Sequence, residues 1–175
     1  MSRAELDENV KEKISGTCRG KFDNYWEEQI KLSGKAISYV KIKTSICLEN
    51  YLSMKFNLKH KIALTRFRLS NHQLMIEKGR YRKNKIDRDM QFCFVCKNQI
   101  EDETHFILRC SLYSPGRRVL EDACRETCVR YDQLNEEQKF VFIMTNENEK
   151  VIKILSKFIF ENLNLRNKMI EYFFL

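Results

Sequence analysis

The feature that most restricts the fold is a group of three cysteines and one histidine near the middle of the chain. Cys93, Cys96, His105 and Cys110 follow the spacing C-x2-C-x8-H-x4-C. A Cys-x-x-Cys pair forms a tight turn in which two thiolates reach one ion, and the following His-x4-Cys brings an imidazole and a third thiolate to its other side. Three sulfurs and one nitrogen complete the closed tetrahedral shell of structural zinc sites. The spacing therefore predicts one structural Zn²⁺ at these residues, with no catalytic role for the metal.

The compartment expected for the chain supports a metal over disulfides. The N-terminus alternates charges and no run of 18 apolar residues occurs, so we expect no signal peptide or membrane span and place the protein in the nucleus or cytoplasm. Thiols clustered in a reducing compartment indicate metal binding or catalysis. A chance pair or a redox pair is the alternative for Cys93 and Cys96, although a redox pair requires a βαβ setting that is missing. Cys124 and Cys128 share a helix face and could extend or replace the site.

The remaining sequence predicts a mainly α domain with this zinc knuckle embedded in it. One proline and five glycines leave few turn signals and long helical stretches. Polar and apolar side chains alternate over residues 38–44, as in a short strand, but a helix is favoured from Ser45. Helices are expected over residues 2–14, 22–32, 45–56, 62–69, 74–79, 114–129, 136–144 and 147–172, with a break at Gly16 and Gly20, a C-cap at Gly79, an N-cap at Ser114 and Pro115 in the first turn that follows.

We expect three segments that form one compact unit. They are an N-terminal helical part (residues 1–90, with a basic segment at 55–88), the zinc knuckle (91–113) and the C-terminal helices (114–175). The last helix carries an apolar stripe. The stripe could lie on a membrane or in a partner's groove, but packing in the core is favoured.

Positive charge is concentrated in the basic segment. Residues 55–88 hold eleven Lys and Arg against two acids, a net +9, whereas the other 141 residues sum to −1. Such a distribution indicates a polyanion partner, because cations that neutralise phosphates release counterions. The mixture of cations with an aromatic suggests phosphate contacts and stacking on an unpaired base; a solvated linker is the alternative. The predicted nucleic-acid-binding residues are Arg66, Arg68, Lys78, Arg80, Tyr81, Arg82, Lys83, Lys85 and Arg88.

The residues between these features carry further expectations. His72 is expected to be an interior or helix-packing histidine, with an extra ligand or a base contact as the alternative. Asp102 or Glu103 either lies at a helix N-terminus and orients His105, or belongs to solvated surface. Glu77 and Arg80 are expected to form a weak ion pair at a helix end.

Two linked motifs resemble a known family. "LTRFRLSNHQLMIEKGRY" is followed by "CFVC" and by "EDETHFILRCSLY" with "GRRVL" behind it. This arrangement resembles the reverse-transcriptase-associated zinc-binding region at the C-terminus of non-LTR retrotransposon polyproteins, over about residues 62–120. The matching positions are Arg68, His72, Leu74, Ile76, Glu77, Gly79, Arg80 and Tyr81 in the first motif, and Cys93, Cys96, Glu101, Glu103, His105, Cys110 and Tyr113 in the second.

The resemblance implies zinc binding and association with nucleic acid during retrotransposition. The polymerase Tyr/Phe-x-Asp-Asp motif, a spaced acidic set and a nuclease signature are all missing from the sequence, so we expect no enzyme activity. RNA and DNA are both open as partners, as are a reverse transcriptase and self-association. The main rival is a zinc-braced helical scaffold for protein interactions. A weaker rival is a metal-dependent nuclease, for which no carboxylate cluster stands at catalytic spacing.

Overall fold

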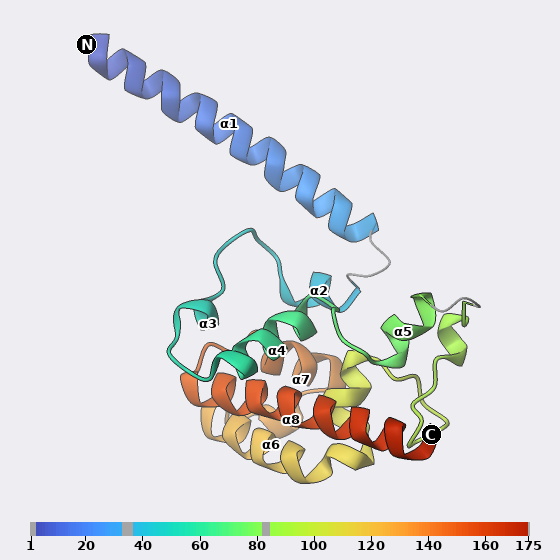
Figure 1. The fold of residues 1–175 in the computed structure, drawn as a ribbon. Coiled ribbons are helices and arrows are strands. Elements are labelled where there is room, and N and C mark those ends of the chain that lie inside the picture. Colours follow the sequence, from blue (N-terminus) through green and yellow to red (C-terminus); the bar gives the residue numbers. More distant parts are fainter. Residues whose placement is uncertain (1–2, 33–36, 82–84, 175) are drawn as a thin grey trace. The chain divides into compact units, whose positions relative to one another are not determined.

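The structure is a computed structural model that describes residues 3–32, 37–81 and 85–174 (Figure 1). The chain divides into two units, Met1–Cys47 and Leu48–Leu175. Residues 48–90 share the second unit with the knuckle and the C-terminal helices. The division into three segments at residues 90 and 113 stays a prediction.

The described residues of the first unit form two helices. Helix α1 (Arg3–Leu32) runs without interruption for 30 residues, so the expected break at Gly16 and Gly20 is wrong. A glycine inside a helix costs only about 1 kcal/mol relative to alanine, so it weakens a long helix without ending it. Helix α2 (Ile37–Ile42) occupies the alternating segment for which a strand was considered.

The second unit holds the remaining helices and the knuckle. Its α-helices are α3 (Asn50–Ser53), α4 (Leu58–Arg68), α5 (Met75–Tyr81), α6 (Ser114–Thr127), α7 (Glu136–Met144) and α8 (Glu149–Phe174). Short turns of other helix types are η1 (Arg88–Met90), η2 (His105–Arg109), η3 (Ser111–Tyr113) and η4 (Tyr131–Gln133). The described ranges contain one isolated bridge, between Phe92 and Ile100, and no named strand. The predicted mainly α fold class is confirmed.

Helix α8 is the centre of this unit. Figure 1 shows it lying between α4 and α6, and both pack against it. Its residues Val151, Leu155, Phe158 and Ile159 are buried, which confirms that the apolar stripe packs in the core. Within the described part of the chain, no helix combines the length and apolarity needed to cross a membrane.

The helix expected from Ser45 is mostly wrong. The chain has no helical residues from 45 to 49, and α3 covers only four residues. A tertiary contact explains this difference: Glu49 and Tyr51 instead serve as partners for Arg68 of α4. The guanidinium lies 2.9 Å from the Glu49 carboxylate and 5.6 Å from the centre of the Tyr51 ring.

The C-cap expected at Gly79 is also wrong, because α5 continues to Tyr81. The glycine is needed for close packing instead. A Cβ at Gly79 would lie 2.6 Å from Nε2, the side-chain amide nitrogen of Gln91. The missing side chain therefore lets the first residue of the knuckle lie directly on α5.

Candidate metal centre

The knuckle begins as a tight backbone loop from Gln91 to Glu101. The Cys93 amide donates to the Gln99 carbonyl at 2.8 Å, and the Glu101 amide donates to the Gln91 carbonyl at 2.9 Å. Lys97 reverses the chain with a φ of 60°, and its amide donates to the Cys93 carbonyl at 2.7 Å. The loop thereby holds the first two cysteines in one turn.

The second half of the site is a π-helical turn, η2. The Cys110 amide donates to the His105 carbonyl at 2.9 Å, a bond between residues five apart. This wide turn explains why the spacing His-x4-Cys brings both ligands to one side. The Asp102 carboxylate accepts the His105 amide at 2.7 Å. Asp102 therefore caps the turn, which is one of the two arrangements expected for this acidic stretch.

The four predicted ligands converge. The ligand atoms of Cys93, Cys96, His105 and Cys110 all lie within 4.8 Å of one another, so the group could hold a metal ion. Cys110 Sγ lies 3.9 Å from Cys93 Sγ and 3.8 Å from Cys96 Sγ. Cys93, His105 and Cys110 are buried. The sulfurs and the imidazole therefore form a compact, mostly buried group of ligand atoms.

The ring orientation of His105 is set by a residue that the sequence did not reveal. Its Nδ1 lies 2.8 Å from the Gln99 side-chain oxygen, so a proton on Nδ1 donates to Gln99. Its Nε2 is buried and has no hydrogen-bond partner among the described residues. An imidazole whose Nδ1 proton is held by an acceptor presents Nε2 as a free ligand.

The close contact between Cys93 and Cys110 shifts the pKa values of both thiols. A hydrogen bond from the Cys110 thiol lowers the pKa of Cys93 to about 3, against the opposing effect of burial. The same hydrogen bond and burial raise the pKa of Cys110 well above its usual range. The hydrogen bond between the two sulfurs therefore favours a thiolate at Cys93, and thiolates are the form of cysteine that binds metals.

A buried ion pair connects the knuckle to α8. Arg166 donates from Nε and Nη2 to the two carboxylate oxygens of Glu101, at 2.6 and 2.5 Å. Both side chains are at most 1% exposed. The guanidinium also lies 5.7 Å from the centre of the ring of Phe94, the residue that follows Cys93. Glu101 further accepts the Met75 amide at 2.7 Å, so one carboxylate joins the knuckle, α5 and α8.

A second buried arginine closes the far side of the turn. Arg117 of α6 donates to the carbonyls of Ile107 at 2.8 Å and Cys110 at 2.5 Å. These carbonyls lie at the end of the π-helical turn, where helical partners are missing. The spacing of residues along the chain does not predict the contacts of Arg166 and Arg117. The family motifs quoted above do contain Glu101 and Arg117.

His72 lies beside the knuckle and is not among the converging ligands. Its side chain is fully buried, and its Nε2 lies 2.9 Å from the Glu103 carboxylate, which also accepts the Ser70 hydroxyl at 3.0 Å. The centre of its ring lies 5.1 Å from that of Phe67. The prediction of an interior, helix-packing histidine is confirmed. Glu103 is therefore buried support for the fold, as opposed to solvated surface.

The two further cysteines lie outside the convergent group. Cys124 is fully buried in α6, and burial raises its pKa to about 12. The group of ligand atoms that lie within 4.8 Å of one another does not include Cys124 or Cys128. Cys128 follows the end of α6. The structure therefore brings together the four predicted ligands and leaves these two aside.

The basic residues have different environments. Arg66, Lys85 and Arg88 are exposed, Tyr81 is 72% exposed, and Lys78 and Arg80 are half-buried. Arg80 lies 3.8 Å from Glu77, the predicted helix-end pair, although Glu77 is buried. Arg82 and Lys83 lie outside the described residues.

Arg68 does not fit its predicted role as a phosphate contact. The residue is 6% exposed and donates to the Met144 carbonyl and to Glu49. A guanidinium that is buried between two acceptors of its own chain cannot also neutralise a phosphate, so Arg68 is structural. Charge composition could not reveal this, because it carries no information on exposure.

Comparison of the chain with protein-family models, curated proteins and solved structures finds no match. The resemblance to the retrotransposon region thus depends on the motif residues alone.

Proposed function

We propose that the protein is a zinc-binding, nucleic-acid-binding module derived from the C-terminal region of a non-LTR retrotransposon reverse transcriptase polyprotein, without polymerase or nuclease activity. The observation that carries this proposal is the convergence of three sulfurs and one imidazole at the predicted positions. The exposed cations of the basic segment support the nucleic-acid part.

The spacing of the ligand atoms favours zinc. Zinc–sulfur bonds of about 2.3 Å in a tetrahedral shell separate the sulfurs by about 3.8 Å. The sulfur of Cys110 lies at 3.9 and 3.8 Å from those of Cys93 and Cys96; a disulfide requires about 2.05 Å. The unpartnered Nε2 of His105 supplies the fourth ligand. When bound, zinc would supply a rigid cross-link between the two halves of the knuckle.

The surface formed by α5 and residues 85–88 favours a polyanion. Arg80 and Tyr81 occupy the last turn of α5, and Lys85 and Arg88 follow as exposed side chains. Exposed cations beside an exposed aromatic can contact phosphates and stack on a base. Affinity would come mainly from phosphates, with little reading of sequence.

Zinc binding is tested by measuring metal content on protein purified without added zinc. We expect one zinc per chain that survives dialysis against a weak chelator. A protein that keeps its helical circular dichroism and holds no metal would contradict the proposal.

Nucleic-acid binding is tested by measuring the affinity for a labelled oligonucleotide as salt is raised. The slope of log affinity against log salt should be close to −0.7 per phosphate neutralised on a single strand. Replacing Lys85 and Arg88 by alanine should reduce its magnitude by about 0.7 for each phosphate that is no longer neutralised. Arg118→Ala, an exposed cation on α6, is the matched control and should leave the slope unchanged.

No binding at low salt would contradict the nucleic-acid function and favour the zinc-braced scaffold. The same samples also test for nuclease activity, by measuring the length of the oligonucleotide after incubation with the protein. Strands of unchanged length agree with the proposal. Cleavage that EDTA abolishes would contradict it.

A further inference from the structure

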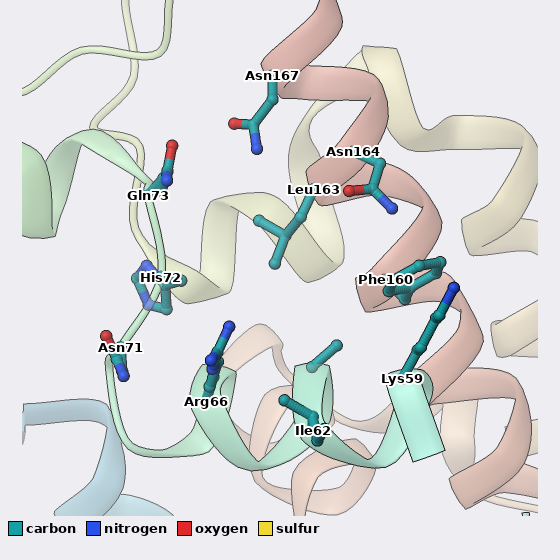
Figure 2. Close-up of a pocket in the computed structure, with 11 residues that line it drawn as sticks. Lys59, Ile62, Arg66, Asn71, His72, Gln73, Phe160, Leu163, Asn164 and Asn167 are labelled. Atoms are coloured by element: carbon teal, nitrogen blue, oxygen red, sulfur yellow. The ribbon is translucent and has the colours of Figure 1, made fainter. Parts of the chain in front are cut away.

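A cavity of about 640 Å³ lies between α4, α8 and the loop of residues 71–73 (Figure 2). Its volume falls within the range of about 300–1,000 Å³ that is typical of small-ligand pockets. The metal ligands do not line it. It is therefore a separate place on the same unit, and the chemistry of its walls indicates what it could bind.

One wall carries positive charge. Lys59 and Arg66 come from α4, one near each end of the helix, and Figure 2 shows Arg66 extending toward the middle of the cavity. No acidic residue lines the cavity, and no ion pair to either cation is found in the described part of the chain. Such a wall attracts anions, and a phosphate is the anion that matches the proposed function.

Side-chain amides line the opposite wall and one end. Asn164 and Asn167 project from α8, while Asn71 and Gln73 come from the loop (Figure 2). Within the described residues, none of these four amides has a side-chain hydrogen bond to protein. Each amide offers two donor hydrogens and an acceptor oxygen, which is the combination that pairs with the edge of a nucleobase.

The remaining lining is apolar and aromatic. Phe160 of α8 lines the cavity, and its ring lies 5.2 Å from that of His60 at an angle of 46°. Leu163 extends into the space between α8 and α4 in Figure 2. An aromatic ring next to an aliphatic side chain provides a platform for a planar base, and base–aromatic stacking does not depend on base identity.

We propose that this cavity binds one unpaired nucleobase together with its phosphate, taken from single-stranded nucleic acid. The amides would contact the base edge, Phe160 would contact the base face, and Arg66 or Lys59 would contact the phosphate. This inference rests on the proposed nucleic-acid function, but it adds a base-binding site whose α8 wall, with Phe160, Asn164 and Asn167, lies outside the basic segment. It also requires a single strand, because paired bases do not present their faces or Watson–Crick edges.

The chain connects the cavity to the cations of α5. Residues 71–73 line the cavity and lead through Leu74 into α5, whose last turn carries Arg80 and Tyr81. A strand that follows the cations of α5 could therefore place one of its bases in the cavity. His72 anchors this loop, because its buried ring contacts Glu103 at 2.9 Å.

The test compares four labelled strands of equal length: single-stranded DNA, single-stranded RNA, duplex DNA, and single-stranded DNA with abasic sugars. The abasic strand keeps the phosphates and removes the bases. Wild-type protein should bind at least one base-bearing single strand about tenfold more tightly than the abasic strand, consistent with stacking of one base. The difference between the DNA and RNA arms then identifies which of the two the cavity prefers.

Two variants remove the walls of the cavity. Phe160→Ala should weaken binding of the base-bearing strand by about tenfold and leave the abasic strand unaffected. Leu165→Ala, on the same helix and outside the cavity, is the matched control. Because Phe160 is partly buried, the double variant Asn164→Ala, Asn167→Ala provides a second test that spares the packing and should give the same selective loss.

The outcomes separate the two proposals. Equal affinity for base-bearing and abasic strands, or no selective loss in either variant, would overturn the cavity proposal while salt-dependent binding leaves the nucleic-acid function standing. No binding to any strand would overturn both.

Discussion

The knuckle (residues 91–113) and the basic segment (residues 55–88) use charged side chains in opposite ways. In the knuckle, Glu101 is buried and joined to a buried arginine of α8. In the basic segment, Arg66, Lys85 and Arg88 are exposed. The comparison teaches that a cation is structural where its surroundings supply acceptors and is available for a partner where they do not.

Arg68 shows that this division does not follow the sequence boundaries. It lies in the basic segment, yet it is buried and bonded like the arginines that support the knuckle. Its removal should therefore destabilise the fold, as removal of a knuckle arginine would, more than it weakens binding to phosphates. Three predictions test this comparison, and they are given in order of decreasing expected effect.

The largest effect is expected from Cys96→Ser. Structural zinc contributes about 10–16 kcal/mol of apparent binding free energy in small zinc domains, whereas whole domains are stable by about 5–15 kcal/mol. The variant should lose the metal and much of its helical circular dichroism at 222 nm. Cys18→Ser, an exposed cysteine of α1, should retain both. A Cys96→Ser protein with unchanged helix content and melting temperature would show that the knuckle does not need a metal.

A smaller but still large effect is expected from Arg166→Met. This change leaves the Glu101 carboxylate buried and unpaired, which costs about 3–5 kcal/mol of unfolding free energy. Urea denaturation measures the loss, and Lys168→Met on the exposed side of α8 controls for the new side chain. Combining Arg166→Met with Glu101→Gln should recover part of the loss, because the buried charge is removed. Equal stability of Arg166→Met and the control would contradict the importance of this pair.

The smallest effect is expected from Arg109→Ala, which removes an exposed ion pair with Glu136. The guanidinium lies 2.6 Å from a carboxylate that is 56% exposed, so the cost should stay below about 1 kcal/mol. The hydrogen bond from Arg109 lowers the pKa of Glu136. A lowered folded-state pKa gives stability that is present above the unfolded pKa of about 4.3 and is lost as pH falls through the folded value.

The pH dependence provides the measurement for this last prediction. The stability difference between wild type and Arg109→Ala should be constant from about pH 6 to 7, to within about 0.2 kcal/mol, and should approach zero as the pH falls well below about 4. A difference that is the same at about pH 3 and pH 7 would show that the pair contributes through packing and not through charge.

The sequence predicted the parts of the fold that depend on local signals. Helix α7 begins and ends at the expected residues, Glu136 and Met144, because Asn135 and Gln138 form a capping box whose atoms are all local. The prediction for the segment from Ser45 failed because its conformation depends on Arg68, which is distant along the chain. The prediction for the glycines of α1 failed because a glycine weakens a helix without ending it.

By itself, the sequence determined the mainly helical fold and the four residues that converge on one candidate metal site. Helical periodicity and ligand spacing are properties of neighbours along the chain, so they can be read without coordinates. Only the tertiary structure decided which cations are buried, that Gln99 orients His105, that Arg166 reaches Glu101, and that α4 and α8 enclose a cavity. These contacts join residues whose separation in the chain carries no signal, and packing and desolvation select them only when the whole unit is assembled.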